Sequence, residues 1–348
     1  MYRLIICIIL FIVSPISFAT EAAFYTLRGE SIKDYQQVSQ WMATMRKHPG
    51  LVNIIISQAY QVDQNGTVWG EINSQLINFT HKQHIKFIAM ITDADFSASV
   101  VNAFLHNSYA QQKTIQQIVT LAKQNKFYGI QMDFEHVPVQ DRQYFTTFYQ
   151  NLADALHQQD IKISAALFPL TSNTPPTNML KQTYNGWAGA YDYKAIGAAS
   201  DFVSIMAYDQ HMGATTPGPM ASIPWDKKII AYTLKYIPAD KVSLGIPTYS
   251  GIWQTSFKDG HMRAIGDDLD YASMQAFLKE NHAKLHWDAE QQIPFTIFNK
   301  DQFNQYIFAE NAKSFAAKLA LVKEYHLRGF SAWRLGMEDP GIWFVLHS

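Results

Sequence analysis

The chain has 348 residues, a formal net charge of −1 at pH 7, and 28 basic against 29 acidic residues. This length suits either two ordinary domains or one large α/β barrel. Because neither sign of charge forms a long run, the composition gives no footprint for binding nucleic acid or an anionic membrane.

The first 19 residues have the pattern of an export signal. Arg3 supplies a positive charge, residues 4–13 form an unbroken apolar run, and the small residues Ser17 and Ala19 follow. The run is too short to span a bilayer, so we expect cleavage near Ala19 and no stable membrane insertion afterwards. The mature protein is then expected in the periplasm or outside the cell. It would contain no thiol, because Cys7 is the one cysteine of the chain.

From residue 20 onward, short apolar segments alternate with amphipathic helical patterns. This alternation predicts a (β/α)8 TIM barrel. The expected strands are Ala23–Leu27, Val52–Ser57, Ile85–Thr92, Tyr128–Glu135, Ile161–Phe168, Asp201–Tyr208, Val242–Pro247 and Gly329–Trp333. The helical patterns between them include residues 115–122, 145–156, 229–237 and 315–325, where apolar side chains recur at helical spacing.

One stretch breaks the barrel repeat. From about residue 250 to 311 no clean strand–helix alternation occurs, and Ile293–Phe298 alternates like an antiparallel strand. We therefore expect a small α+β insertion after the seventh barrel strand. With no linker or internal repeat, residues 20–348 are predicted to form one barrel that includes this insertion.

The fourth expected strand carries the chemistry. Its residues alternate with the period of a strand. The set predicted to face the surrounding helices is Ile130, Met132 and Phe134, and the set predicted to face the barrel axis is Gly129, Gln131, Asp133 and Glu135. A buried carboxyl group needs a partner or a raised pKa, and barrels of this kind build active sites at the C-terminal ends of their strands. Packing alone therefore hardly explains Asp133 and Glu135, which become candidates for a functional site.

Together with other motifs, this strand resembles the Asp-Gly-x-x-x-Asp-x-Glu strand of family-18 glycoside hydrolases, the chitinase-like barrels. Residues 202–211, Phe-Val-Ser-Ile-Met-Ala-Tyr-Asp-Gln-His, resemble the sixth strand of that family, with Tyr208 as its active-site tyrosine. Residues 329–343 resemble the eighth strand, whose tryptophan (Trp333) forms the floor of the sugar site. The resemblance covers nearly the whole mature chain. It is nearest to the bacterial branch of spore-cortex-lytic enzymes and polysaccharide-associated barrels.

The resemblance implies a glycosidase that cleaves a β-linked polysaccharide containing N-acetylglucosamine. Such enzymes retain the anomeric configuration by substrate assistance. Glu135 would protonate the glycosidic oxygen, while Asp133 and Tyr208 would hold the acetamido group that attacks the anomeric carbon. The substrate-binding candidates are Trp333, Asp209, Gln131, Gln210, His211 and Tyr249. His211 is either a sugar contact or a loop histidine, and Asp209 either binds sugar or braces Tyr208.

The sequence departs from the family pattern in its fourth and third expected strands. Tyr128 and Gln131 stand where the family has aspartates, and the amide of Gln131 cannot share a proton with Asp133. Residues 89–93 lack the Ser-x-Gly-Gly of typical chitinases, which argues against a conventional enzyme for insoluble chitin.

The alternative from another class is a chitinase-like lectin that binds carbohydrate without turnover, but the presence of Glu135 favours the enzyme. No residue spacing typical of a metal site occurs, and no cofactor is expected. Chitin oligomers, peptidoglycan and an exopolysaccharide all stay open as substrates, as does endo or exo action. We expect a monomer.

Overall fold

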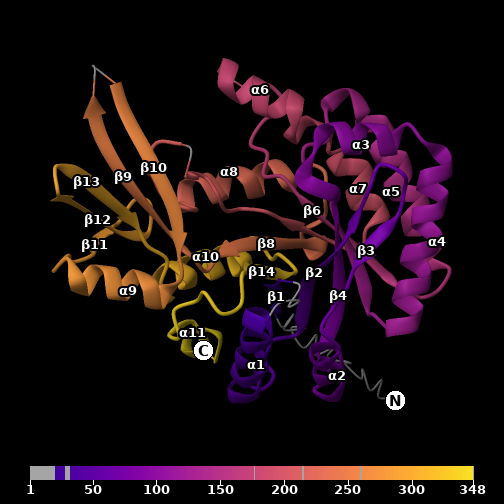
Figure 1. Ribbon diagram of the computed structural model, residues 1–348, viewed down its shortest axis with the longest axis horizontal. Coiled ribbons are helices and arrows are strands. Elements are labelled where there is room, and N and C mark those ends of the chain that lie inside the picture. Colours follow the sequence, from indigo (N-terminus) through magenta and orange to yellow (C-terminus); the bar gives the residue numbers. More distant parts are fainter. Residues whose placement is uncertain (1–19, 28–31, 176, 214, 259–260, 348) are drawn as a thin grey trace, which may run out of the picture.

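The computed structural model describes residues 20–27, 32–175, 177–213, 215–258 and 261–347, so the predicted export signal lies outside the described residues. Eight parallel strands close into a barrel through pairing of the first strand with both the last and the second (Figure 1). These are β1 (Glu21–Thr26), β2 (Ile54–Val62), β4 (Lys86–Asp93), β5 (Gly129–Asp133), β6 (Lys162–Leu167), β7 (Phe202–Ile205), β8 (Val242–Pro247) and β14 (Gly329–Trp333). A short strand, β3 (Val68–Gly70), pairs antiparallel with β2. The predicted TIM barrel is confirmed.

Two barrel strands end earlier than predicted. β5 ends at Asp133 and β7 at Ile205, whereas we expected them to reach Glu135 and Tyr208. After β7 the backbone turns at once, because the amide of Ala207 donates to the carbonyl of Ile205 (2.7 Å). Glu135 and Tyr208 therefore stand on loops just beyond the strand ends.

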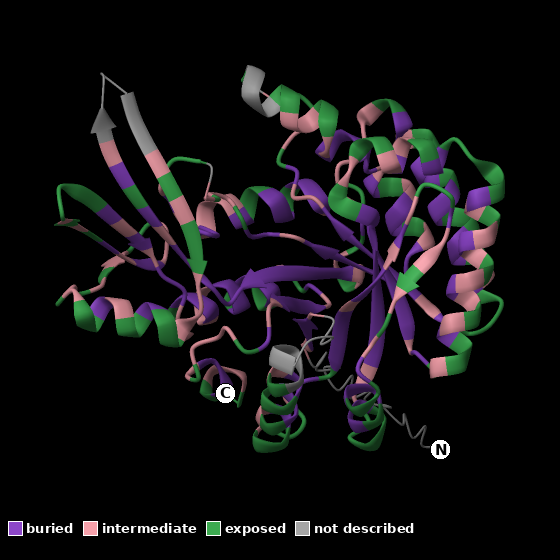
Figure 2. Ribbon diagram, viewed as in Figure 1, coloured by how far each residue is buried: buried purple, intermediate pink, exposed green. Residues whose placement is uncertain are grey.

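Helices surround the barrel, and Figure 2 shows their inward faces and the barrel strands buried while the outer helix faces are exposed. Their bounds are α1 (Ile32–Lys47), α2 (Ser74–Lys82), α3 (Ala98–Leu105), α4 (Ser108–Asn125), α5 (Arg142–His157), α6 (Asn178–Gly186), α7 (Tyr193–Ala199), α8 (Ile223–Thr233), α10 (Ala312–Glu324) and α11 (Ile342–His347). The period predicted for residues 145–156 is confirmed in α5, which buries Phe145, Phe148, Tyr149, Leu152 and Leu156. Among the described residues, no helix combines the length and apolarity needed to cross a bilayer.

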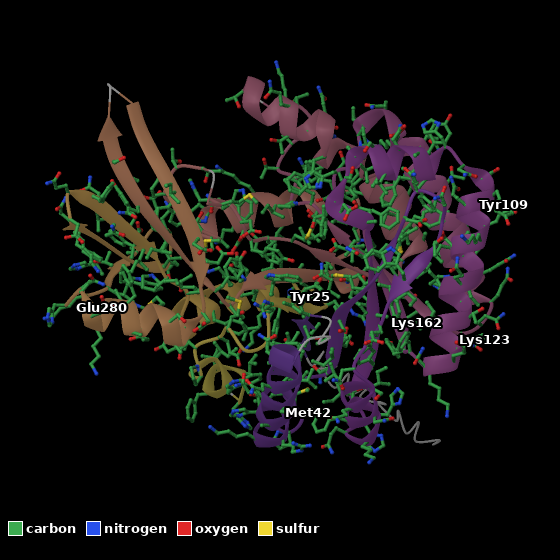
Figure 3. All side chains as sticks on the ribbon, viewed as in Figure 1. Tyr25, Met42, Tyr109, Lys123, Lys162 and Glu280 are labelled. Atoms are coloured by element: carbon green, nitrogen blue, oxygen red, sulfur yellow. The ribbon has the colours of Figure 1, made fainter. Side chains whose placement is uncertain are left out.

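The interior of the barrel is packed with side chains rather than open. An apolar cluster around Tyr25, labelled among the barrel strands in Figure 3, fills it from β1, β2, β4 and β7. Gln131 also points inward, and its amide nitrogen donates to the hydroxyl oxygens of Ser164 (3.1 Å) and Ser204 (3.2 Å). Ile130, Met132 and Phe134 pack in the outer core with the helices. The predicted alternation of this strand is thus confirmed.

The predicted insertion follows β8, the seventh barrel strand. It consists of β9 (Ser250–Lys258), β10 (His261–Leu269), α9 (Tyr271–Glu280), β11 (His286–Asp288), β12 (Ile293–Lys300) and β13 (Phe303–Phe308). Its strands form an antiparallel sheet in the order β10-β9-β13-β12-β11, which lies to one side of the barrel (Figure 1). Trp253 of β9 is buried and donates from Nε1 to the carbonyl of Met212 (3.2 Å). This contact ties the insertion to the loop after β7.

Candidate active site

A cavity of about 560 Å³ lies at the C-terminal ends of the barrel strands, where the fold class places active sites. Its walls are mainly apolar, with aromatic rings from Phe96, Phe168, Tyr184, Trp187, Tyr208, Trp225 and Trp333. The carboxyl groups in the lining belong to Asp133, Glu135 and Asp209. A concave, mostly apolar site with a few convergent polar groups is the usual form of a small-ligand or substrate pocket.

The two predicted catalytic carboxyl groups meet in this cavity. Asp133 is 5% exposed, and burial raises its pKa well above the ordinary range, with the neighbouring carboxylates of Glu135 and Asp93 adding to the effect. Burial likewise raises the pKa of Glu135 to about 7, and the charges of Asp93 and Asp209 contribute. Because a general acid works best with a pKa near the working pH, Glu135 is suited to donate a proton near neutrality.

Asp93 is a member of this cluster that sequence reasoning missed. Its side chain is 1% exposed, and one carboxylate oxygen accepts a hydrogen bond from the backbone amide of Glu135 (2.8 Å). Burial raises the pKa of Asp93 to about 7. The available signal was an aspartate at the end of the third barrel strand, next to the strand that carries Asp133. Only the parallel pairing of β4 with β5 gives that position its meaning.

Tyr208 and Trp333 form one side of the cavity. Their ring centroids lie 6.3 Å apart with planes 28° from parallel, and Tyr25 packs against Trp333 at 5.2 Å. Gly245 on β8 makes room for this arrangement. A Cβ atom there would lie 2.9 Å from the ring of Tyr208 and would clash with the carbonyl oxygen of Ile205. The structure therefore brings Tyr208 and Trp333 into the same cavity as the acid pair.

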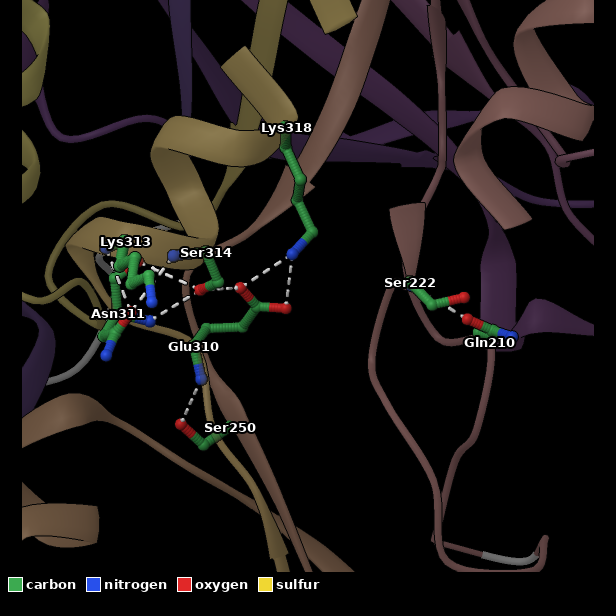
Figure 4. A network of polar contacts seen from close by, with 8 residues as sticks. All are labelled: Gln210, Ser222, Ser250, Glu310, Asn311, Lys313, Ser314 and Lys318. Atoms are coloured by element: carbon green, nitrogen blue, oxygen red, sulfur yellow. Dashed lines mark hydrogen bonds and ion pairs between the residues drawn. The ribbon is translucent and has the colours of Figure 1, made fainter. Parts of the chain in front are cut away.

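Asp209 and Gln210 line the cavity from the loop that follows Tyr208. Asp209 has a left-handed backbone (φ 58°), and its carboxylate accepts a hydrogen bond from the hydroxyl of Tyr249. Desolvation at the cavity wall raises the pKa of Asp209. The side-chain oxygen of Gln210 accepts from the amide of Ser222 (2.9 Å), as drawn in Figure 4.

The remaining predicted substrate contacts are two buried side chains, Gln131 and Tyr249, and one loop histidine, His211. Gln131 is fully buried beneath Asp133, and Tyr249 is 2% exposed behind Asp209. His211 uses Nδ1 to donate to the carbonyl of Thr216 (2.9 Å), so its ring braces its own loop. None of these three side chains belongs to the described cavity lining.

The cavity has a second aromatic wall, which the sequence did not predict. The ring of Trp187 lines the cavity, stacks on His136 with centroids 4.3 Å apart, and contacts Phe168 at 5.1 Å. Sequence reasoning did not single out Trp187. No local pattern marks it as a cavity residue, because the long segment between β6 and α7, which contains α6, carries it there.

A closed (β/α)8 barrel with an acid pair at the end of its fourth strand suits a barrel glycosidase. Residues 30–338 match the family model described as glycosyl hydrolases family 18, and the chain belongs to that family. The protein is accordingly a glycosidase, and the resemblance predicted from the motifs is confirmed.

Three relatives illustrate the range of the family. The chain is 29% identical over 306 residues to the uncharacterized glycosylase YvbX of Bacillus subtilis (strain 168), with 86% of this chain and 85% of that protein covered. It is 29% identical over 292 residues to the cortical fragment-lytic enzyme of the same organism, with 83% of this chain and 65% of that enzyme covered. The crystal structure of a chitinase from Chromobacterium violaceum ATCC 12472 superimposes with a TM-score of 0.80 at 27% identity, with 94% of this chain and 98% of that chain covered.

Proposed function

We propose that this glycosidase hydrolyses β-linkages in a chitin-like polymer or in peptidoglycan, next to N-acetylhexosamine, with Glu135 as general acid and base. The observation that carries the proposal is the position of Asp133 and Glu135. Both carboxyl groups line one cavity, both have raised pKa values, and Tyr208 and Trp333 lie beside them.

The proposed reaction has two steps. Glu135 protonates the glycosidic oxygen as the bond to the anomeric carbon breaks, while the acetamido oxygen of the substrate attacks that carbon and forms an oxazolinium ion. Asp133 orients the acetamido group and offsets the positive charge on its nitrogen, and the Tyr208 hydroxyl donates a hydrogen bond to the same group. Glu135 then takes a proton from water as the water oxygen attacks the anomeric carbon. General acid–base help of this kind typically contributes roughly 10² to 10⁴ in rate.

The other predicted residues take supporting roles in this proposal. The apolar ring of Trp333 supports the carbohydrate face of the sugar, and Asp209 and Gln210 bind hydroxyl groups at the cavity wall. Tyr249 braces Asp209 through its hydrogen bond, and Gln131 binds serine hydroxyls in the barrel interior below Asp133. His211 fixes the loop after Tyr208.

The substrate class rests on the family and on the names of the relatives. One is a cortical fragment-lytic enzyme and another a chitinase, and both names point to glycans that contain N-acetylglucosamine. We propose that the expected export signal at residues 1–19 takes the barrel to such a polymer outside the cytoplasm.

The first test is mass spectrometry of products from chito-oligosaccharides and from purified peptidoglycan, with wild type, Glu135→Gln and the surface control Glu324→Gln. We expect wild type and control to release fragments with a new reducing-end N-acetylhexosamine. Glu135→Gln should bind the same glycan but release at least about 10²-fold less product. Binding without product in the wild type would favour the lectin alternative. Loss of binding in Glu135→Gln would contradict the catalytic role.

A further inference from the structure

The backbone that carries the proposed catalytic acid is not held by the barrel sheet. The ladder between β4 and β5 ends at the pair Thr92 and Asp133, and Glu135 follows two residues later. Beyond the end of this ladder, two side chains hold the backbone instead. The hydroxyl of Tyr191 donates to the carbonyl of Phe134 (2.7 Å), and the carboxylate of Asp93 accepts from the amide of Glu135 (2.8 Å).

The second oxygen of Asp93 has its own partner. It accepts a hydrogen bond from the backbone amide of Ser97 (3.0 Å), which closes the turn after β4. Within that turn, Asp95 (φ 61°) and Phe96 (φ 46°) both adopt left-handed backbone conformations that need support from the surroundings. Phe96 lines the cavity. One buried carboxyl group thus connects the backbone of Glu135 to the turn that carries a cavity wall.

The charged surroundings of Asp93 are also defined. The titratable groups that face it are Asp133 and Glu135 on the β5 side, Asp95 on its own turn, and the Tyr191 phenol. The charge of Asp93 is one of those that raise the pKa of Glu135. On β5 itself the position below Asp133 is the neutral Gln131, whose amide is bonded to serine hydroxyls. The third carboxyl group of the cluster therefore comes from β4.

We propose that Asp93 is a positioning residue of the glycosidase reaction, which fixes the backbone of Glu135 and places a third carboxyl group beside the acid pair. At 1% exposure it cannot reach the substrate, so it acts through Glu135. The proposal rests on the catalytic role proposed for Glu135.

Two variants separate the two parts of this role. Asp93→Asn keeps one oxygen that can accept from the amide of Glu135, but it removes the negative charge and replaces the oxygen that accepts from the amide of Ser97 with a non-accepting NH2 group. Asp93→Ala removes the charge and both oxygens. The matched control is Asp141→Asn, because Asp141 is also 1% exposed and hydrogen-bonded, to Asn102 (2.8 Å) and His106 (2.9 Å), and does not line the cavity.

In wild type, Asp93→Asn and the control, carboxyl-carbon NMR titration follows the pKa of Glu135, and kcat and KM are measured across pH. We expect Asp93→Asn to lower the Glu135 pKa and move the alkaline limb of kcat/KM in the acid direction by at least about half a pH unit, a shift that the control lacks. Asp93→Ala should lower kcat by a further factor of about 10 to 100 with KM changed less than about threefold.

An unchanged Glu135 pKa and pH profile in Asp93→Asn would overturn the proposal. The same shift in Asp141→Asn would overturn it as well, since the effect would then not depend on contact with the cluster. The NMR titration requires no turnover, so it tests the placement of Asp93 even if the wild type cleaves neither glycan and the proposed function fails.

Discussion

At the level of single residues, the acid cluster affects stability as well as chemistry. The pKa of Glu135 rises from 4.5 to about 7 on folding, mainly because of burial. Between these values the folded state binds more protons than the unfolded state. The free energy of unfolding therefore falls as the pH rises through this window and stays at the lower level above it. Asp93, whose pKa rises to about 7, contributes in the same direction.

This pH dependence of the free energy of unfolding leads to a prediction for Glu135→Gln. The uncharged amide avoids the cost of ionising the carboxyl group in the cavity, so the variant should gain up to about 3 kcal/mol in unfolding free energy at about pH 8. At about pH 4 the gain should vanish, because the carboxyl group is then protonated in both states. Urea unfolding at the two pH values measures the difference. An equal gain at both values would mean that packing, not charge, explains the effect.

At the level of elements, a buried polar network joins the insertion to the barrel (Figure 4). It lies where β13 leads into α10, which begins with the capping box of Asn311 and Ser314. Glu310 (4% exposed) pairs with the fully buried Lys318 of α10 at 2.8 and 2.9 Å. The backbone amide of Glu310 also donates to the hydroxyl of Ser250, the first residue of β9 (3.0 Å). Both ends of the insertion therefore meet at Glu310, whose side chain forms the ion pair.

Removal of one partner of this pair should be costly. Lys318→Ala would leave the carboxylate of Glu310 buried without its counter-ion, and such changes typically cost about 3–5 kcal/mol. The control is Lys227→Ala, because Lys227 pairs with Glu324 at 3.6 Å with side chains 45% and 52% exposed. An exposed pair of this kind contributes at most about 1 kcal/mol. Urea unfolding compares the two losses, and equal losses would contradict the stabilising role of the buried pair.

At the level of the whole molecule, the overall charge of −1 hides an uneven distribution. The described lining of the cavity contains the carboxyl groups of Asp133, Glu135 and Asp209 but no lysine, arginine or histidine. Any of these lining groups that is ionised therefore carries a negative charge. A second group of acids lies close by on the insertion. Burial raises the pKa of Asp268 most, Asp209 and Asp267 add to the effect, and Arg334 acts in the opposite direction.

We therefore expect the protein to prefer neutral glycans. Repulsion of one substrate carboxylate at such a site corresponds to roughly three- to thirtyfold in kcat/KM at low salt. The measurement compares a chito-oligosaccharide with a muramic-acid oligosaccharide of equal length, and with the same oligosaccharide after its carboxyl groups are converted to amides. Amidation should restore most of the loss, and added salt should narrow the difference. Equal turnover of the free acid and its amide would contradict this expectation.

Much of the barrel and part of the site could be predicted because their signals are local. Alternation along residues 129–135 determines which side chains face inward, and the helical period of residues 145–156 determines the buried face of α5. These patterns depend on backbone geometry within a few residues, so they are readable without the fold. The long stretch without a barrel repeat likewise predicted the insertion, since a missing repeat is also a local observation.

Only the tertiary structure determined which distant residues complete the site. Asp93 meets Glu135 through the pairing of two strands, Trp187 reaches the cavity at the end of α6, and Gln131 lies too deep to line it. The ends of β5 and β7 could not be predicted either, because these strands leave the sheet at Asp133 and Ile205 although the neighbouring strands β6 and β8 run on. Such contacts join residues far apart in the sequence, and their register is fixed by closure of the whole barrel rather than by any local pattern.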